Sequence, residues 1–230
     1  MKPEEYVLRA TDLYYKGDYE GAINNLDKAI VLKSDFAEAW YNKGIVFSVV
    51  CRHEEEVEAY NRAIQIKPDY AEAWNNKSAA LGKLGRFEEA LQASVKTLEL
   101  KPWFAVAWCN KGAALGWLAR DEEAIEAYDK ALEFQSDYVE AWNNKGVALF
   151  NLDKLDEAIK ALDNAIKLKS DYAESWYNRA RVYSKKRINK KAFSDLKKAI
   201  DHDNSFKYEA KKDKVFINLE RDQEFIKLTE

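Results

Sequence analysis

The sequence predicts an all-α protein, a right-handed superhelical α-solenoid that stacks one helix-turn-helix unit many times. Three observations lead to this fold class: tryptophan recurs at a fixed spacing, each unit holds two amphipathic segments, and helix-breaking residues are scarce. The 230 residues include only 8 Gly and 3 Pro, and no segment alternates in the manner of a strand. Self-similarity at such a period is typical of solenoids, in which each unit packs on its neighbours.

The repeat is marked by five tryptophans, each 34 residues after the one before. They are Trp40, Trp74, Trp108, Trp142 and Trp176. A related tetrad, such as Tyr-Asn-Lys-Gly after Trp40, follows each of them, so we expect the same local structure each time. The register gives six units and a C-terminal segment, at 3–36, 37–70, 71–104, 105–138, 139–172, 173–206 and 207–230.

The unit at 71–104 shows why each repeat should contain two helices. Residues 71–84 place alanine, tryptophan and leucine at helical offsets on one face. Gly85 to Phe87 interrupts this pattern, and a second amphipathic segment follows, with acidic residues in its first turn, where they complement the helix dipole. Pro102 ends the second helix, because proline cannot continue a helix.

Small residues recur where the two helices of a unit must approach closely. Ala90 stands sixteen residues after its tryptophan, and Ala124, Ala158 and Ala192 follow at the same spacing. The second unit departs from this pattern, because Glu56 stands where alanine is expected. This predicts either altered packing there or a helix that rotates the carboxylate outward.

These residues resemble the tetratricopeptide repeat family closely. The family pattern of Trp, a small residue, an aromatic or Leu, Ala, an aromatic, Ala and Pro is met by Trp108, Gly112, Leu115, Ala124, Tyr128 and Ala131, with Ser136 replacing the Pro. The frequent Leu of the family is replaced by a cation in all five tryptophan units, at Lys43, Lys77, Lys111, Lys145 and Arg179. The resemblance implies that the first helices line a concave groove that binds a protein or peptide segment.

The C-terminal segment departs from the repeat and has its own order. Two short copies of one pattern begin at Asp213 and Asp222, each an aspartate able to cap a helix and each followed by apolar residues. We expect 207–230 to be a helical cap, because the last unit of a stack needs its outer face covered.

An asparagine two residues after each tryptophan gives the main candidate binding residues, Asn42, Asn76, Asn110, Asn144 and Asn178. A carboxamide carries a donor and an acceptor, as a peptide bond does, so five at one helical position could hold an extended backbone. Similar asparagine ladders line the repeats of O-linked N-acetylglucosamine transferases and the groove of importin-alpha. The alternative is that each asparagine bonds neighbouring helices and only shapes the groove.

Neighbouring positions are expected to supply specificity. The residues directly after the tryptophans include Tyr41, Asn75, Asn143 and Tyr177. Trp117 and Phe150 are candidate anchors, since large aromatic residues often dominate binding energy. Arg181 and Lys185 add positive charge in the last repeat.

Charge suggests a second possible mode of association. Residues 173–214 hold 13 Lys and Arg against 6 Asp and Glu, whereas 1–172 hold 22 against 30. A self-associating scaffold, in which acidic first repeats dock head-to-tail on the basic last repeat, is therefore the alternative function.

Other functions are disfavoured by the sequence. A clamp for the acidic tails of the Hsp70 and Hsp90 chaperones needs cations where this chain has carboxylates, as at Glu72. A nucleic-acid partner is disfavoured, because the total charge is −3 and the basic run at 185–191 lacks interleaved aromatics. No metal, cofactor or catalytic motif occurs, so we expect no enzyme activity. Without an apolar span or a signal sequence, and with two unrelated cysteines, we expect a cytoplasmic protein.

Overall fold

The structure is a computed structural model that describes all 230 residues. It confirms the all-α helical repeat solenoid. The first twelve helices follow one another as six pairs: α1 (Pro3–Tyr15) and α2 (Tyr19–Leu32), α3 (Ala37–Val49) and α4 (His53–Ile66), α5 (Ala71–Lys83) and α6 (Phe87–Leu100), α7 (Ala105–Trp117) and α8 (Asp121–Phe134), α9 (Val139–Asn151) and α10 (Leu155–Leu168), α11 (Ala173–Lys185) and α12 (Asn189–His202). The chain ends in α13 (Phe206–Lys212), the 3₁₀ helix η1 (Lys214–Phe216) and α14 (Gln223–Thr229).

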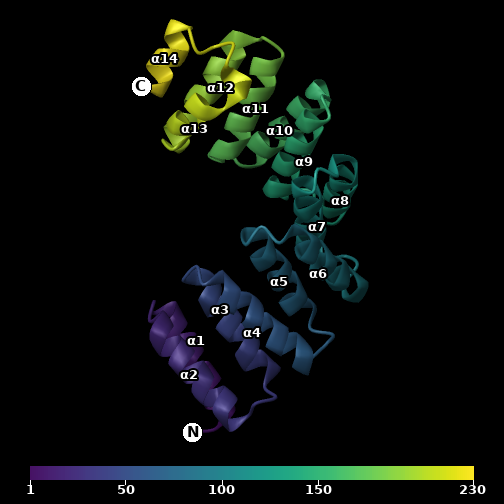
Figure 1. Cartoon of the computed structure of the whole chain (residues 1–230), viewed down its shortest axis with the longest axis vertical. Helices are drawn as coiled ribbons and strands as arrows, with labels where there is room; N and C mark the ends of the chain where they lie inside the picture. The colour runs from purple at the N-terminus through teal and green to yellow at the C-terminus, as the bar shows by residue number, and fades with distance from the viewer. The chain divides into compact units, whose positions relative to one another are not determined.

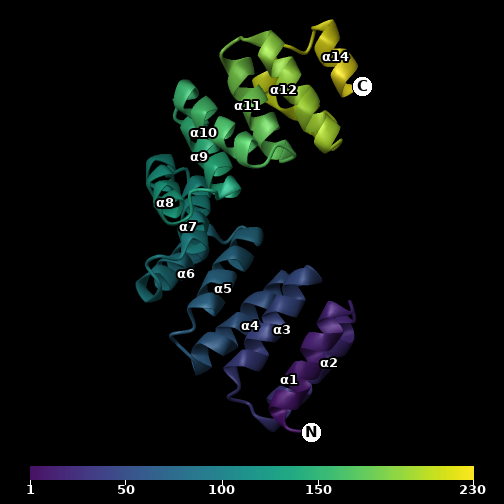
Figure 2. The ribbon, with the colours of Figure 1, turned by 180° about the vertical axis from the view of Figure 1, so that it is seen from behind.

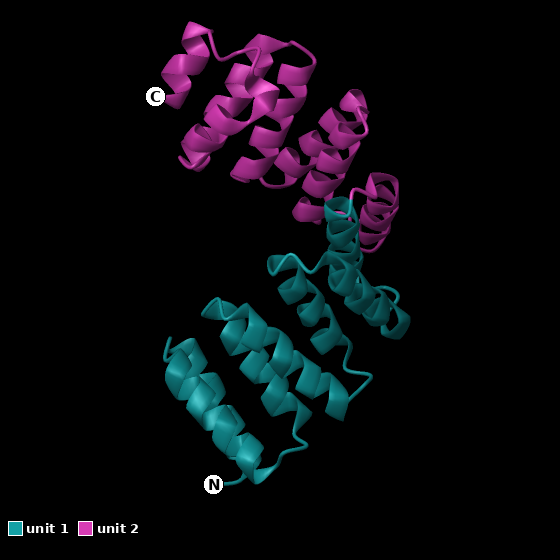
Figure 3. Cartoon of the chain, in the orientation of Figure 1, with its two compact units in different colours: residues 1–118 teal, residues 119–230 magenta.

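The chain divides into two compact units, 1–118 and 119–230, coloured separately in Figure 3. Unit 1 holds α1 to α7 and unit 2 holds α8 to α14. Within each unit, helices that follow one another along the chain lie side by side, as both views of the ribbon show (Figures 1 and 2). None of the helices is long and apolar enough to cross a bilayer.

The turn between the two helices of each pair has one residue in the left-handed region. Glycine takes this position at Gly17 and Gly85, where φ is 80° and 72°. The other four turns place residues with a Cβ there, at Cys51, Ala119, Asp153 and Arg187. Such residues adopt this conformation at an energetic cost, so the surrounding helices must hold these turns in place.

Close helix contact within a pair depends on the small residues of the repeat. A Cβ added to Gly44 would lie 2.4 Å from Cε1 of Tyr60, which is almost fully buried. At Gly146 it would lie 2.6 Å from Cγ of Leu162. The large side chain of the second helix therefore fills the space that the small residue of the first helix leaves open.

Glu56 shows how the second pair adapts to a carboxylate at an alanine position. Of the two alternatives expected for this position, outward rotation is wrong, because Glu56 is 2% exposed. Its Oε2 atom lies 2.8 Å from Nδ1 of His53. The helix α4 begins at His53, and the spacing of three residues places the imidazole beside the carboxylate. The buried oxygen therefore has a polar partner, which burial requires.

The cation that replaces the family's leucine lies over the repeat tryptophan. The Lys Nζ or Arg Cζ atom is 4.8 to 5.6 Å from the ring centroid in all five repeats, in the pairs Lys43 with Trp40, Lys77 with Trp74, Lys111 with Trp108, Lys145 with Trp142 and Arg179 with Trp176. Cation–π attraction is strongest over tryptophan. Lys43 also forms an ion pair of 2.6 Å with Asp27 on the preceding second helix. In that repeat the cation therefore links its own tryptophan to the neighbouring pair.

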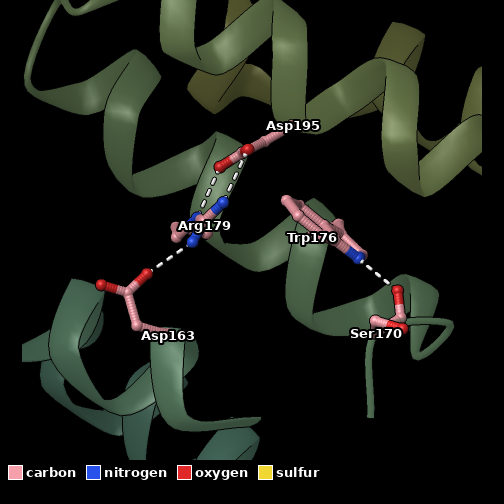
Figure 4. A network of polar contacts seen from close by, with 5 residues as sticks. All are labelled: Asp163, Ser170, Trp176, Arg179 and Asp195. Carbon is pink, nitrogen blue, oxygen red and sulfur yellow. Dashed lines mark hydrogen bonds and ion pairs between the residues drawn. The ribbon is translucent and has the colours of Figure 1, made fainter. Parts of the chain in front are cut away.

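Arg179 extends this arrangement in the last repeat, shown in Figure 4. Its Nε and Nη2 atoms donate to the two carboxylate oxygens of Asp195, at 2.6 and 2.8 Å, and Nη1 donates to Asp163. The nearby Trp176 donates from Nε1 to the carbonyl of Ser170. Burial raises the pKa of Asp195, and the hydrogen bonds from Arg179 offset this only in part. The guanidinium of Arg179 on α11 therefore binds to both α10 and α12 through its three nitrogen atoms.

The C-terminal segment covers the last helix pair. The Asp213 side chain accepts a hydrogen bond from the backbone N–H of Val215, and that of Asp222 accepts one from Glu224, so both expected caps are confirmed. Phe216 is fully buried, in a cluster that also contains Leu196 of α12. The segment thus supplies apolar contacts that a further repeat would otherwise make.

Candidate functional site

In unit 1 the asparagine positions form a hydrogen-bonded series across the first helices α3, α5 and α7. Nδ2 of Asn76 donates to the Tyr41 hydroxyl at 3.2 Å, and Nδ2 of Asn110 donates to Oδ1 of Asn75 at 3.0 Å. Asn75 in turn donates from Nδ2 to Oδ1 of Asn76 at 3.2 Å. These contacts join neighbouring repeats, as the alternative interpretation of the ladder supposed.

The series still leaves hydrogen-bonding capacity on the surface. A carboxamide has two donors and an oxygen with two lone pairs, and Asn76 uses one donor and one lone pair within the series. Asn76 and Asn110 are half-buried, whereas Asn75 is buried. Asn76 and Asn110 therefore join the helices and still have unused hydrogen-bonding groups near the surface, while Asn75 serves the helix contact.

Tyr41 belongs to the same series and to an aromatic cluster. Its ring centroid lies 4.8 Å from that of Tyr70 and 5.8 Å from that of Tyr60. Burial raises the pKa of the Tyr41 phenol, and the hydrogen bond from Asn76 opposes this increase. The hydroxyl therefore stays protonated at neutral pH and is positioned to accept from Asn76.

A cavity of about 130 Å³ opens between the first helices α1 and α3. Its lining is mostly apolar and aromatic, with Ala10, Thr11, Tyr14, Tyr15, Leu26, Asn42, Ile45 and Val46. Tyr15 is 81% exposed, so the cavity has a large aromatic side chain at the surface. Among the predicted candidates, only Asn42 contributes to this lining. Tyr14 and Tyr15 were not predicted, although each lies where the first helices of later repeats carry candidate residues.

Trp117, the predicted anchor of unit 1, is 72% exposed at the end of α7. Its indole stacks on the ring of Phe87, with centroids 5.2 Å apart and planes only 4° from parallel. The repeat does not need Trp117 as a core residue, yet Phe87 holds the indole in one orientation. An exposed aromatic side chain held in this way loses little entropy on binding a partner.

Unit 2 repeats the asparagine arrangement. Nδ2 of Asn178 donates to Oδ1 of Asn143 at 3.1 Å, and Asn143 donates to Oδ1 of Asn144 at the same distance. The hydroxyl of Ser175 also donates to Asn143, at 3.0 Å. Asn143 is buried, whereas Asn144 and Asn178 are half-buried. In both units a buried asparagine therefore serves the contact between helices, whereas the half-buried asparagines lie nearer the surface.

The other predicted residues of unit 2 gather at α9, α11 and the C-terminal segment. Cζ of Arg181 and Nζ of Lys185 each lie 4.8 Å from the ring centroid of Phe150, which is 8% exposed. Tyr177 is buried, and its hydroxyl donates to Asp213 at 3.1 Å. Burial and the nearby Asp213 raise the Tyr177 pKa. Phe150 and Tyr177 thus serve packing, and the two cations remain closer to the surface.

A larger cavity, of about 410 Å³, lies where α11 meets the C-terminal segment. Its lining is Phe150, Ser184, Lys185, Arg187, Lys214, Val215 and Asn218. Sequence reasoning identified Phe150 and Lys185 but missed the others. The basic run at 185–191 was a usable signal for Arg187, whereas Lys214 and Asn218 come from a segment interpreted only as a cap. Nowhere in the chain do three His, Cys, Asp or Glu side chains gather as metal ligands.

Comparisons with known proteins agree with this repeat architecture. Sequence profiles described as "TPR repeat" match 11–48 and 120–153, and profiles described as "Tetratricopeptide repeat" match 37–70, 59–92, 139–172 and 173–205. Together the matches cover 11–92 and 120–205. An uncharacterized protein of Methanocaldococcus jannaschii, MJ0572, is 38% identical over 59 residues, which are 26% of this chain and 69% of that protein.

Solved structures with the same fold include three repeat proteins. PilF of Pseudomonas aeruginosa covers 94% of this chain and 96% of its own, at 19% identity and a TM-score of 0.72. MamA of Desulfovibrio magneticus covers 74% and 96%, at 19% identity and 0.69. YrrB, described as a TPR protein with an unusual peptide-binding site, covers 81% and 97%, at 25% identity and 0.61. The chain belongs to the tetratricopeptide repeat family and is a non-enzymatic scaffold for protein–protein interaction.

Proposed function

We propose that the first-helix surface of unit 1 binds an extended peptide segment of a partner protein. The observation that carries the proposal is the cavity between α1 and α3, because it places an apolar hollow beside the carboxamide of Asn42. Ligand sites commonly combine an apolar lining with a few polar groups that fix orientation. The peptide-binding site described for YrrB supports a site of this kind on the same fold.

The chemistry of the surface indicates how a segment would be held. An aliphatic side chain of the peptide would enter the cavity, and free donors and lone pairs of Asn42, Asn76 and Asn110 would bind its backbone. The exposed indole of Trp117 would supply a further apolar contact. Backbone hydrogen bonds give affinity without selecting a sequence, whereas the cavity selects a side chain.

A peptide selection tests the proposal. Phage display of random dodecapeptides would select a binding peptide, and calorimetry would measure its affinity. Ile45→Arg should fill the cavity with a cation and weaken the selected peptide by roughly tenfold or more, because apolar burial is lost. Val31→Arg is the matched control, because Val31 is exposed on α2 and does not line the cavity. Equal affinities of both variants for every selected peptide would reject the cavity as the binding site.

We propose that the repeats keep the register 3–36, 37–70, 71–104, 105–138, 139–172 and 173–206, with 207–230 as the cap. Two profile matches, at 37–70 and 139–172, begin and end on this register.

We also propose a cytoplasmic location. It is supported by the exposed Cys51 and the buried Cys109, neither of which forms a disulfide in the structure.

Head-to-tail self-association is a second candidate function. The net positive charge of 173–214 and the net negative charge of 1–172 favour it. Light scattering at several salt concentrations tests it, because salt screens attraction between exposed charges. An oligomer that dissociates with salt supports self-association, whereas a monomer at every salt concentration contradicts it.

A further inference from the structure

The cavity between α11 and the C-terminal segment has a strongly one-sided charge. Three of its seven lining residues are cations, Lys185, Arg187 and Lys214, and none is acidic. Ser184 and Asn218 are the polar neutral residues of the lining, and they bond to one another, with Ser184 Oγ 3.0 Å from Asn218 Oδ1. Phe150 and Val215 add apolar surface.

Two of the three cations have no carboxylate partner. Lys185 forms an ion pair of 2.8 Å with Asp153, whose side chain is 72% exposed. The neighbouring Lys186, outside the lining, pairs with Asp156. No ion pair holds Arg187 or Lys214, although carboxylates pair with most of the other cations along α11. The cavity therefore presents two uncompensated positive charges.

The local backbone keeps these cations at the cavity. Arg187 is in the left-handed turn between α11 and α12, with φ of 58°. Lys214 opens η1, whose position is fixed by the Asp213 cap and by the hydrogen bond from the Ser184 hydroxyl to the Val215 carbonyl at 2.8 Å. Both side chains thus extend from short, hydrogen-bonded turns on either side of the hollow.

We propose that this cavity binds carboxylate groups of an acidic peptide. The proposal rests on the proposed interaction function, which it deepens by naming the chemistry of a partner. Guanidinium and ammonium groups favour carboxylates, and the half-buried Val215 of the lining would contact the aliphatic part of a glutamate or the side chain beside it. The carboxylate can come from Asp and Glu side chains or from a free C-terminus.

A peptide fits the cavity better than a nucleic acid. Strand-binding surfaces combine a long basic groove with aromatic rings on which successive bases stack. Here the cations surround one hollow, and its single aromatic ring, Phe150, is already covered by Arg181 and Lys185.

Fluorescence anisotropy with three rhodamine-labelled pentapeptides tests the proposal on the full chain. One peptide has two glutamates on each side of a leucine and an amidated C-terminus. The second has glutamines instead, and the third is the glutamine peptide with a free C-terminus. The glutamate peptide, the free-terminus peptide or both should bind about tenfold more tightly than the amidated glutamine peptide, because only they carry carboxylates. Which of the two binds identifies the source of the carboxylate.

Variants with matched controls locate the binding. Arg187→Gln and Lys214→Gln should each weaken the carboxylate peptide by roughly three- to tenfold, because each removes a charge-assisted contact. Lys197→Gln removes the same charge from the exposed face of α12, outside the cavity, and should leave the affinity within about twofold, since distant exposed charges are screened.

A second pair of variants tests the role of Lys185. Asp153→Asn should strengthen binding by releasing Lys185, and asparagine tolerates the left-handed backbone at this position. Asp156→Asn is the control and should not strengthen binding, because Asp156 pairs with Lys186, which lies outside the lining.

Several results would overturn the proposal. Equal affinity for all three peptides, or no measurable affinity for any, removes the carboxylate specificity. An equal loss in Lys197→Gln and Lys214→Gln shows general charge attraction instead of a site. Binding of a uridine octanucleotide that depends on Arg187 and Lys214, without peptide binding, assigns the cavity to nucleic acid. The cavity variant Ile45→Arg of unit 1 decides the proposed function separately, so each proposal can fail without the other.

Discussion

Nδ2 of Asn110 on α7 donates to Oδ1 of the buried Asn75 on α5, over 3.0 Å. Two first helices of neighbouring repeats are thus joined through side chains that stand 35 residues apart in the chain. The pair explains why an asparagine can recur at one position of a repeat without any ligand. The contribution of the asparagine series to the free energy of unfolding can therefore be measured without a binding partner.

Asn110→Ala should lower the free energy of unfolding by about 1 to 3 kcal/mol, because the buried oxygen of Asn75 loses its donor from the neighbouring helix. Urea unfolding followed by circular dichroism measures the change. Asn24→Ala is the matched control, since Asn24 is exposed on α2 and forms no side-chain hydrogen bond in the structure. Equal stability of the two variants would contradict a structural role for Asn110.

Trp108→Ala should cost about 3 kcal/mol, near the lower end of the range for large aromatic truncations, because the side chain is half-buried. It also loses the hydrogen bond from Nε1 to the Pro102 carbonyl, at 2.7 Å, and the contact with Lys111. Trp117→Ala on the same helix should cost less than about 1 kcal/mol, because Trp117 is exposed. Thermal unfolding distinguishes them. Similar losses in both variants would show that burial does not explain the tryptophan series.

Glu56→Ala should stabilise the protein or leave it unchanged, because it restores the alanine of the repeat and removes a buried carboxylate. The His53 side chain is 21% exposed and can then bond to water instead. His53→Ala should have the opposite effect and cost about 1 to 3 kcal/mol, because the buried Glu56 oxygen loses its partner. Calorimetric melting of both variants gives the two signs. A lower melting temperature for Glu56→Ala than for His53→Ala would contradict this account.

Tyr70 makes stability depend on alkaline pH. Burial, followed by the effect of Tyr41, raises the pKa of Tyr70 to about 12. Because this folded-state pKa is above the unfolded value of about 10, the contribution is complete below pH ~10 and is lost as the pH rises from about 10 to about 12. Urea unfolding at pH 8 and pH 11 should therefore show a smaller alkaline decline for Tyr70→Phe than for the unchanged protein. Tyr208→Phe, at an exposed position, should decline as the unchanged protein does.

The sequence was sufficient for the fold because the repeat fixes local features that act within one or two units. Trp74, Ala90 and Pro102 define two helices and a turn, and within each unit the helices pack against their sequence neighbours. The exposure of the binding candidates was harder to predict, because it depends on which face of the helix each side chain occupies after packing. Asn75 and Asn76 are adjacent in sequence, yet one is buried and the other half-buried.

Features without a periodic signal were harder to predict. The cavity at Lys214 forms only when the C-terminal segment meets α11, and no spacing in the sequence brings Lys214 to Arg187. The partner of Glu56 was within reach of the sequence, because His53 precedes it by three residues at a helix start. The sequence left altered packing and outward rotation as alternatives at Glu56, because the repeat pattern alone does not show whether a buried carboxylate has a polar partner.

Two departures from the repeat in the last unit should compensate for one another. Asp195 stands where the second helices of the four preceding repeats have Ala161, Ala127, Ala93 and Ala59, and Arg179 stands where those four repeats have lysine. Asp195 is buried and depends on the two hydrogen bonds from Arg179. Arg179→Lys alone should therefore cost several kcal/mol, up to about 3 to 5, because a buried carboxylate loses a bidentate partner. Adding Asp195→Ala removes that carboxylate, leaves the substituted lysine free to pair with Asp163 as Lys145 pairs with Asp129, and should restore most of the lost stability. Urea unfolding of the single variants and the double variant measures the coupling, and additive losses would show that the two departures are independent.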